Sequence, residues 1–209
     1  MKIEIWSDIM CPFCYIGKRQ LETALAEFPD EEFEIEWKSF QLDPTIPLQS
    51  GQDVFTFLAE HKGISVEQSI AMHKDVTERA KSVGLDYHFE KAIVSNSLPA
   101  HRIIHLAKTK NLAGEMEEIF FKAYFTEGRD LNDDPTLLEL AESAGLPSDE
   151  VLEVLKNDKL FLNDVHTDII EAKQVGVQGV PFFAFDRKYA VSGAQPVEAF
   201  VQTIKELQK

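Results

Sequence analysis

The two cysteines of the 209-residue chain lie only two residues apart, in the segment Cys11-Pro12-Phe13-Cys14. They follow an alternating apolar run over residues 2–7, which is typical of a strand, and they precede a stretch with helical periodicity. Proline is favoured at the first position of a helix, because the N–H group that it lacks would have no partner there. The segment therefore predicts a strand that leads into a helix, with Cys11 as the N-cap and Cys14 about one turn further in.

This placement makes the pair chemically reactive. The nucleophilic form of cysteine is the thiolate, and the free N–H groups and the positive dipole end at a helix N-terminus stabilise an anion. Cys14 is close enough to Cys11 to close a disulfide, and it lies deeper in the helix. We therefore predict that Cys11 is the nucleophile of a disulfide exchange and that Cys14 resolves the mixed disulfide.

Two other uses of such a pair agree less well with the sequence. A structural zinc site needs about four nitrogen or sulfur ligands, but there is no second Cys-x-x-Cys, and nothing connects His101 and His105 with Cys11. A structural disulfide across two residues would constrain the unfolded chain very little. We therefore predict neither a metal site nor a purely structural role for the cysteines.

The composition predicts a soluble protein with a substantial core. Hydrophobic residues make up 44% of the chain, and the formal net charge is −15, which argues against nucleic-acid and anionic membrane partners. No segment approaches the roughly 18 apolar residues of a membrane span. Lys2, Glu4 and Asp8 interrupt any signal-peptide core. We expect a cytoplasmic location, where stable disulfides are rare and a dithiol is more often catalytic.

The first forty residues contain the pattern of a βαβ unit. Residues 2–7 and 33–40 alternate between apolar and polar side chains, and residues 12–28 between them have helical spacing and end at Pro29. This order predicts two parallel strands joined by a right-handed crossover.

Strand patterns return near the end of the chain. Residues 182–185 and 188–191 flank Asp186-Arg187 and predict a hairpin, although the turn lacks the favoured glycine. A helix is expected to start after Pro196.

The residues between these two regions carry helical patterns and little strand pattern. We expect about six helices from residue 52 to residue 174. Ser65 with Gln68 has the spacing of a capping box, and Asp134 before Pro135 has the pattern of an N-cap.

The sequence therefore predicts an α/β sheet domain, βαβ…ββα, interrupted by a large all-helical insertion. Residues 1–45 and 175–209 are assigned to the sheet domain, and residues 46–174 to the insertion. Within the insertion, the aromatic cluster Phe120-Phe121 and Tyr124-Phe125 is expected in the core or in one wall of an apolar groove.

Several stretches besides the cysteine motif share their pattern with one family. In chain order, they are Ile5-Trp6-Ser7-Asp8, Cys11-Pro12-Phe13-Cys14-Tyr15-Ile16-Gly17, Phe40-Gln41-Leu42-Asp43-Pro44, residues 96–102, Ala123-Tyr124-Phe125-Thr126-Glu127-Gly128, Gly179-Val180-Pro181-Phe182-Phe183 and residues 189–196. The chain resembles the thioredoxin superfamily, within the DsbA-like group that has a helical insertion. It is most similar to the FrnE-like dithiol-disulfide isomerases.

The resemblance implies a thioredoxin-like fold and a protein disulfide oxidoreductase or isomerase. Cys11 and Cys14 would be its catalytic residues, with Pro12 and Phe13 completing the active-site motif. Phe13 offers no charge and no hydrogen bond to a Cys11 thiolate, unlike the Pro-His pair of strongly oxidising relatives. We therefore expect a disulfide of intermediate redox potential.

The resemblance also implies where a substrate binds. The Val180–Pro181 bond would be cis and packed against the cysteines, and the Val180 backbone would bind an extended peptide or thiol. Pro181 would shape this groove and protect the cysteine pair from metal capture. His101 lies in a matching stretch and is expected to border the same groove.

Relatives with a different activity leave an alternative open. The kappa-class glutathione transferases and the 2-hydroxychromene-2-carboxylate isomerases resemble this chain, but they generally have Ser at the position of Cys11. They also hold glutathione with an acidic residue after a Gly-x pair, where this chain has Gly193-Ala194-Gln195. A glutathione-dependent isomerase or transferase is therefore the second hypothesis, and a non-enzymatic redox-sensing adaptor is the third.

These hypotheses determine the expected partners. We predict protein or small thiol and disulfide substrates, and no cofactor apart from glutathione as a candidate co-substrate. No nucleic acid and no membrane are expected as partners. The direction of exchange and the oligomeric state stay open.

Overall fold

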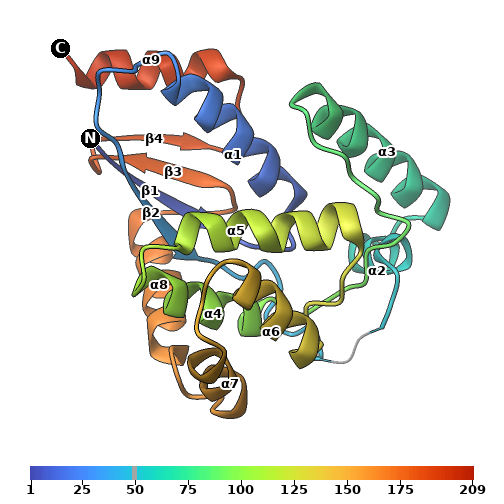
Figure 1. Cartoon of the computed structure of the whole chain (residues 1–209). Coiled ribbons are helices and arrows are strands. Elements are labelled where there is room, and N and C mark those ends of the chain that lie inside the picture. Colours follow the sequence, from blue (N-terminus) through green and yellow to red (C-terminus); the bar gives the residue numbers. More distant parts are fainter. Residues whose placement is uncertain (49–50) are drawn as a thin grey trace.

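The computed structural model describes residues 1–48 and 51–209 and contains one four-stranded mixed sheet (Figure 1). The strand order is β2-β1-β3-β4, where β1 is Lys2–Ser7, β2 is Glu34–Ser39, β3 is Phe182–Phe185 and β4 is Tyr189–Ser192. β1 runs parallel to β2 and antiparallel to β3, and β3 runs antiparallel to β4. The parallel pair and the hairpin predicted from the sequence are both confirmed.

The β3–β4 hairpin turns without a glycine. Asp186 and Arg187 both have positive φ, 48° and 53°, which is uncommon for residues with a side chain. Both side chains are held by β1: the Asp186 carboxylate accepts a hydrogen bond from the Lys2 N–H at 2.8 Å, and the Arg187 guanidinium donates two hydrogen bonds of 2.5 Å to Glu4. These contacts stabilise the positive-φ conformation of Asp186 and Arg187 in the turn.

Helices cover both faces of the sheet. On one face lie α1 (Pro12–Leu25) and α9 (Val197–Leu207), and on the other lies α8 (Leu162–Val175) (Figure 1). The first face buries an apolar cluster whose members come from both strands and helices, among them Ile3, Ile5, Leu21, Phe183, Phe185, Phe200 and Ile204. On the second face, Trp6 and Ala184 pack against Ala172 of α8.

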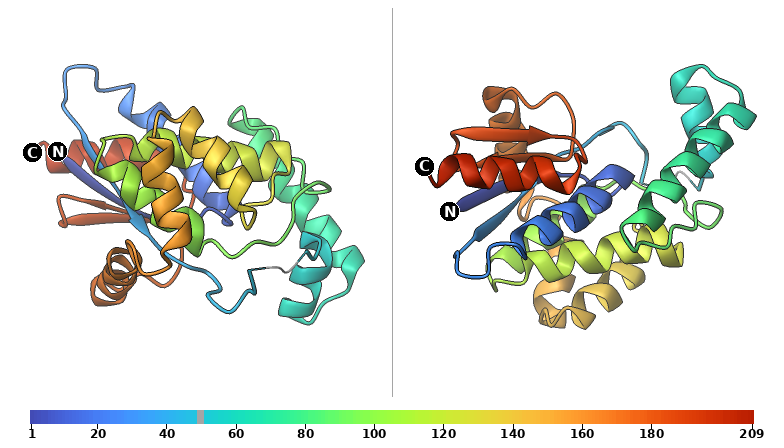
Figure 2. Two further views of the ribbon diagram at one scale, coloured as in Figure 1. Left: turned by 60° about the horizontal axis from the view of Figure 1, so that its bottom comes forward. Right: turned by 90° about the horizontal axis from the view of Figure 1, so that it is seen from above.

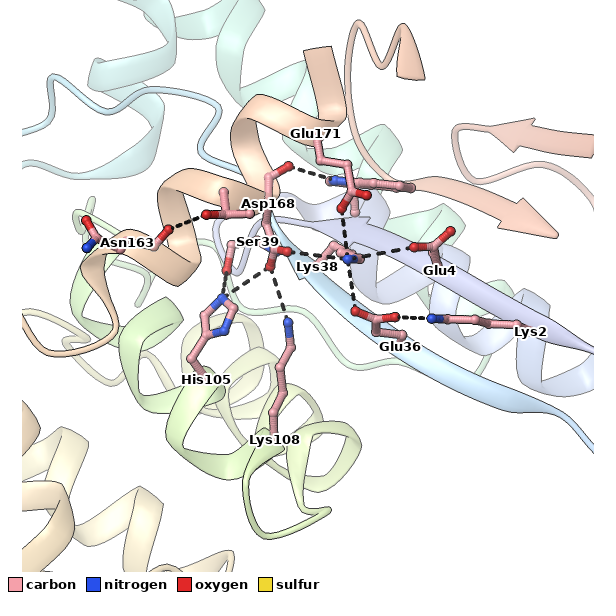
Figure 3. A network of polar contacts seen from close by, with 12 residues as sticks. Lys2, Glu4, Glu36, Lys38, Ser39, His105, Lys108, Asn163, Asp168 and Glu171 are labelled. Atoms are coloured by element: carbon pink, nitrogen blue, oxygen red, sulfur yellow. Dashed lines mark hydrogen bonds and ion pairs between the residues drawn. The ribbon is translucent and has the colours of Figure 1, made fainter. Parts of the chain in front are cut away.

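A polar network also fastens α8 to the sheet (Figure 3). Lys38 of β2 lies 2.9 Å from Glu171 and 3.6 Å from Asp168, both on α8. The backbone N–H of Ser39 donates to Asp168 at 2.9 Å, and the Asp168 carbonyl accepts a hydrogen bond from the Trp6 indole at 3.0 Å.

The helical segment between β2 and β3 contains more helices than predicted. Within the described residues it has seven α-helices and one π-helical turn: α2 (Val54–Lys62), α3 (Val66–Ser82), α4 (Leu98–Lys108), α5 (Ala113–Lys122), η1 (Ala123–Glu127), α6 (Asp134–Ser143), α7 (Ser148–Lys156) and α8. The predicted Ser65–Gln68 capping box is present at the start of α3. Helices α2 and α3 form a hairpin that projects from the rest of the molecule (Figure 2).

Two predicted helix ends are wrong by a few residues. The first helix ends at Leu25 rather than at residue 28: the N–H groups of Glu27 and Phe28 donate to carbonyls three residues back, and Pro29 disfavours a helical conformation at Phe28. The N-cap of α6 is Asp133 rather than Asp134, since the Asp133 carboxylate accepts hydrogen bonds from the N–H and the hydroxyl of Thr136 at 3.0 and 2.7 Å.

The position of α8 bears on the predicted domain division. The boundary at residue 174 assigns nearly all of α8 to the insertion, whereas α8 packs on the sheet and forms one of its covering layers. The division into residues 1–45 with 175–209 and residues 46–174 stays a prediction. Among the helices of the described segments, none is long and apolar enough to cross a membrane.

Candidate active site

Cys11 and Cys14 lie at the start of α1, as the sequence predicts. Cys11 is the N-cap, with extended φ and ψ of −88° and 110°, and the helix begins at Pro12. The Cys11 N–H donates to the carbonyl of Asp8 at 2.9 Å, and the Cys14 N–H donates to the carbonyl of Cys11 at 3.0 Å. Both cysteines are free thiols and both are buried.

The second part of the site comes from the segment before β3. The Val180–Pro181 peptide bond is cis, as the family resemblance implies. The Cys11 thiol donates to the Val180 carbonyl at 3.4 Å. A Cβ on Gly17 would lie 2.9 Å from Pro181 Cγ, so the absence of a side chain at position 17 lets α1 approach the proline.

Burial determines the state of Cys14. It raises the pKa of the Cys14 thiol well above 9.0, and the nearby Cys11 sulfur raises it further. The Asp8 backbone and the Ser7 side chain act in the opposite direction, toward a lower pKa of Cys14. Cys14 is therefore a protonated thiol at neutral pH.

A cavity of about 650 Å³ lies beside the motif. Cys11, Pro12, Phe13 and Val180 form part of its wall. Most of the remaining wall comes from the segment after β2, from α2 and α3, and from η1, which contributes Tyr124 and Phe125. The prediction that these two aromatic residues form a groove wall or core is confirmed in both respects, because they are also almost fully buried.

Two residues that the sequence analysis did not identify contact the motif. Tyr87 donates a hydrogen bond from its hydroxyl to the Pro12 carbonyl at 2.7 Å. The Arg79 guanidinium lies 5.1 Å from the centroid of the Phe13 ring and donates to the Ala194 carbonyl at 3.1 Å, so it links α3 to both halves of the site. No motif marks either residue, since each lies more than sixty positions from Cys11.

His101 does not occupy the position expected for a substrate-binding residue. Its side chain is completely buried, it is not part of the cavity wall, and Nε2 lies 3.5 Å from Asp8 Oδ1. Direct contact between His101 and a substrate is therefore not supported. Burial raises the pKa of Glu117, another carboxyl of this interior region, from 4.5 to about 7, although the neighbouring His101 and Lys108 act in the opposite direction.

His105 is also removed from the cysteines. Its Nε2 lies 3.2 Å from Ser39 Oγ and 3.2 Å from Asp168 Oδ2, in the network under α8 (Figure 3). Within residues 1–48 and 51–209, no three His, Cys, Asp or Glu side chains are grouped in a way that would hold a metal ion.

Comparison with known proteins identifies the family. The sequence matches the DSBA-like thioredoxin domain over residues 2–205. The crystal structure of the probable DsbA oxidoreductase SCO1869 from Streptomyces coelicolor is 40% identical, with 99% of this chain and 89% of that chain covered and a TM-score of 0.94. Two structures of lower identity show the same fold. One is the cytosolic disulfide reductase DsbM from Pseudomonas aeruginosa, with 17% identity, a TM-score of 0.70, and 100% of this chain and 99% of that chain covered. The other is a 2-hydroxychromene-2-carboxylate isomerase, with 15% identity, a TM-score of 0.74, and 100% of this chain and 96% of that chain covered. The chain therefore belongs to the family of DSBA-like thioredoxin domain proteins.

Proposed function

We propose that the protein is a thiol–disulfide oxidoreductase in which Cys11 attacks and Cys14 resolves. One observation carries the proposal: Cys11 lies at the N-terminus of α1, in the wall of a cavity and within hydrogen-bond distance of the carbonyl before a cis-proline. Cys14 lies behind it, buried and absent from the cavity wall. The 40% identity to a probable DsbA oxidoreductase supports the same activity.

The exchange follows from this arrangement. The Cys11 thiolate attacks one sulfur of a substrate disulfide, the substrate S–S bond breaks, and the released thiolate takes a proton. Cys14 then loses its proton and attacks the Cys11 sulfur, which forms the Cys11–Cys14 disulfide and releases the second substrate thiol. Two electrons pass from the protein to the substrate. The same steps in reverse oxidise a substrate dithiol.

The order of the two cysteines follows from their surroundings. Because burial raises the pKa of Cys14, this residue stays protonated while Cys11 reacts. The Asp8 backbone and Ser7, which act to lower the pKa of Cys14, favour the Cys14 thiolate as it forms. Reduction, oxidation and isomerisation all use this exchange.

The second hypothesis, a glutathione-dependent isomerase or transferase, receives less support. A 2-hydroxychromene-2-carboxylate isomerase has the same fold, but only 15% of residues are identical. Gln195, at the position where such relatives hold glutathione, donates its side-chain amide to the Ser192 carbonyl at 2.9 Å. We also keep the proposal that the protein belongs to a FrnE-like subgroup. We further propose a cytoplasmic location, by analogy with the reductase DsbM, which is described as cytosolic.

Trapping and turnover test the proposal together. Cys14→Ala should accumulate a mixed disulfide between Cys11 and a protein disulfide substrate such as insulin, whereas Cys11→Ser should form none. The wild-type protein should accelerate reduction of insulin by dithiothreitol at least tenfold. Trapping without turnover would favour the redox-sensing adaptor, and glutathione binding without either result would favour the transferase.

A further inference from the structure

The cavity beside Cys11 has the size of a small-molecule site. Its volume of about 650 Å³ lies within the range of roughly 300–1,000 Å³ that is typical of ligand pockets. A protein substrate could exchange its disulfide at the mouth of such a cavity without filling it, whereas a compact molecule would bury most of its own surface inside. Because Cys11 is part of the wall, the occupant must place a sulfur there.

The helical hairpin α2–α3 supplies an apolar part of this wall. Phe57 and Leu58 come from α2, and Met72 and Val76 come from α3. Met72 is 42% exposed, although it is apolar. Apolar surface that gathers in a concave site indicates a ligand with an apolar body.

The same wall carries two cations without acidic partners. Within the described residues, Lys62 and Arg79 lie beyond ion-pair distance of any carboxylate, including the three acidic residues of the cavity wall. Arg79 is the nearer of the two to the reactive motif, because its guanidinium stacks on Phe13. It donates one hydrogen bond, to the Ala194 carbonyl, so further N–H groups are available to a carboxylate. In a chain with a net charge of −15, this places a guanidinium without an acidic partner against Phe13, two residues from Cys11.

We propose that the substrate is a small disulfide, or its thiol, with an apolar body and a carboxylate close to the sulfur. The inference rests on the proposed function. The apolar body lies against the α2–α3 part of the wall, and the carboxylate binds Arg79. Cys11 forms a bond to one substrate sulfur and the first thiol leaves; Cys14 then closes the protein disulfide and the second thiol leaves. In the assay, dithiothreitol supplies the two electrons for each further turnover.

Two matched probes test the apolar body. The disulfides of N-acetylcysteine and N-hexanoylcysteine have the same reacting sulfur and the same carboxylate, and they differ by four methylenes in each half. Each buried methylene is worth about fourfold in binding. We expect kcat/KM to be at least tenfold higher for the hexanoyl compound.

Substitutions in α3 connect this preference with the cavity. Val76→Phe fills the cavity and should reduce the preference for the hexanoyl compound at least fivefold. Ile70→Phe is the matched control, because Ile70 is on the same helix, exposed and outside the cavity wall. Leu58→Trp fills the cavity from α2 and provides a second test if Val76→Phe does not fold.

Arg79→Met tests the carboxylate. It should lower kcat/KM at least fivefold for the free acids and less than twofold for their methyl esters. Equal loss with acids and esters would overturn the assignment of Arg79.

The inference would be overturned if the wild-type protein showed no preference for the longer acyl chain, or if the preference survived both cavity-filling variants. In either case, reduction of insulin would still support the proposed function. If neither insulin nor the small disulfides react, the proposed function fails as well.

Discussion

The Cys11 sulfur lies 3.4 Å from the carbonyl oxygen of Val180, although 169 positions separate the two residues in the sequence. The contact joins the start of α1 to the segment that leads into β3. It holds the reactive sulfur between a helix N-terminus and a backbone carbonyl, where a substrate sulfur must approach from the cavity.

The first prediction concerns the reactivity of the two thiols. In the reduced protein at pH 7, iodoacetamide should modify Cys11 at least tenfold faster than Cys14. Cys11 lines the cavity, whereas Cys14 does not, and burial raises the pKa of the Cys14 thiol well above 9.0. Mass spectrometry of quenched samples measures both rates, and unfolding in urea should remove the difference. Equal labelling of the folded protein would contradict the assignment of roles.

Gly17→Ala should disturb the contact between α1 and the cis-proline segment. The new Cβ would lie 2.9 Å from Pro181 Cγ and 3.0 Å from Phe183 Cζ, closer than normal packing allows. We expect a loss of about 1–3 kcal/mol in the free energy of unfolding and a slower exchange with insulin. Gly114→Ala is the control, because its nearest neighbour atom is 3.6 Å away in an ordinary contact. Urea titration measures the free energy of unfolding of both variants, and only Gly17→Ala should show the loss.

Phe13→His should make the disulfide more oxidising. Histidine at this position can donate a hydrogen bond to the Cys11 thiolate, which stabilises the reduced form, whereas phenylalanine cannot. The potential should rise by at least about 30 mV, which corresponds to about 1.4 kcal/mol. Equilibration with glutathione buffers measures it, and Phe13→Leu should leave it unchanged. A wild-type value as high as the roughly −120 mV of DsbA would contradict the expected intermediate potential.

Asp168→Asn should weaken the attachment of α8 to the sheet (Figure 3). Burial alone would raise the pKa of Asp168, but the contact with His105, the charge of Lys108 and the Ser39 N–H lower it to about 2. Its stabilising effect is therefore present above its ordinary pKa of 3.8 and is lost as the pH falls through about 2.

At pH 7 the substitution should cost about 1–3 kcal/mol, because Lys108 loses its carboxylate partner and the buried Ser39 N–H loses a charged acceptor, whereas Lys38 keeps Glu36 and Glu171 at 2.9 Å. Below pH 2 the variant and the wild type should converge in chemical unfolding experiments. Glu206→Gln, which breaks the exposed pair with Lys209, should leave the unfolding midpoint unchanged.

Glu117 affects the pH dependence of stability in the sense opposite to that of Asp168, and Glu117→Gln should remove this effect. Burial raises the pKa of Glu117 from 4.5 to about 7, so the folded protein keeps a proton that the unfolded chain releases between these values. The free energy of unfolding of the wild type therefore falls from about pH 4.5 to pH 7, by at most about 3 kcal/mol from this group. Glutamine resembles the protonated form, and the variant should lack this decrease. Identical pH profiles would show that Glu117 does not titrate in this range.

The elements around the cysteine motif could be predicted from the sequence because their signals are local. Alternation over residues 2–7, proline after Cys11 and the short Asp186-Arg187 turn each depend on neighbours within a few positions. These signals placed the strand, the helix N-cap and the hairpin, and with them the reactive pair. They were least reliable at helix ends, as at Asp133, where one side-chain hydrogen bond decides the position.

Other contacts of the site were decided by tertiary structure alone. Arg79 and Tyr87 reach the motif from the helical segment, and His101 is buried behind Asp8 rather than placed in the cavity. Nothing in the spacing of these residues indicates their partners. Helical periodicity shows which side of a helix is apolar, but which apolar surface it meets depends on the packing of the whole chain.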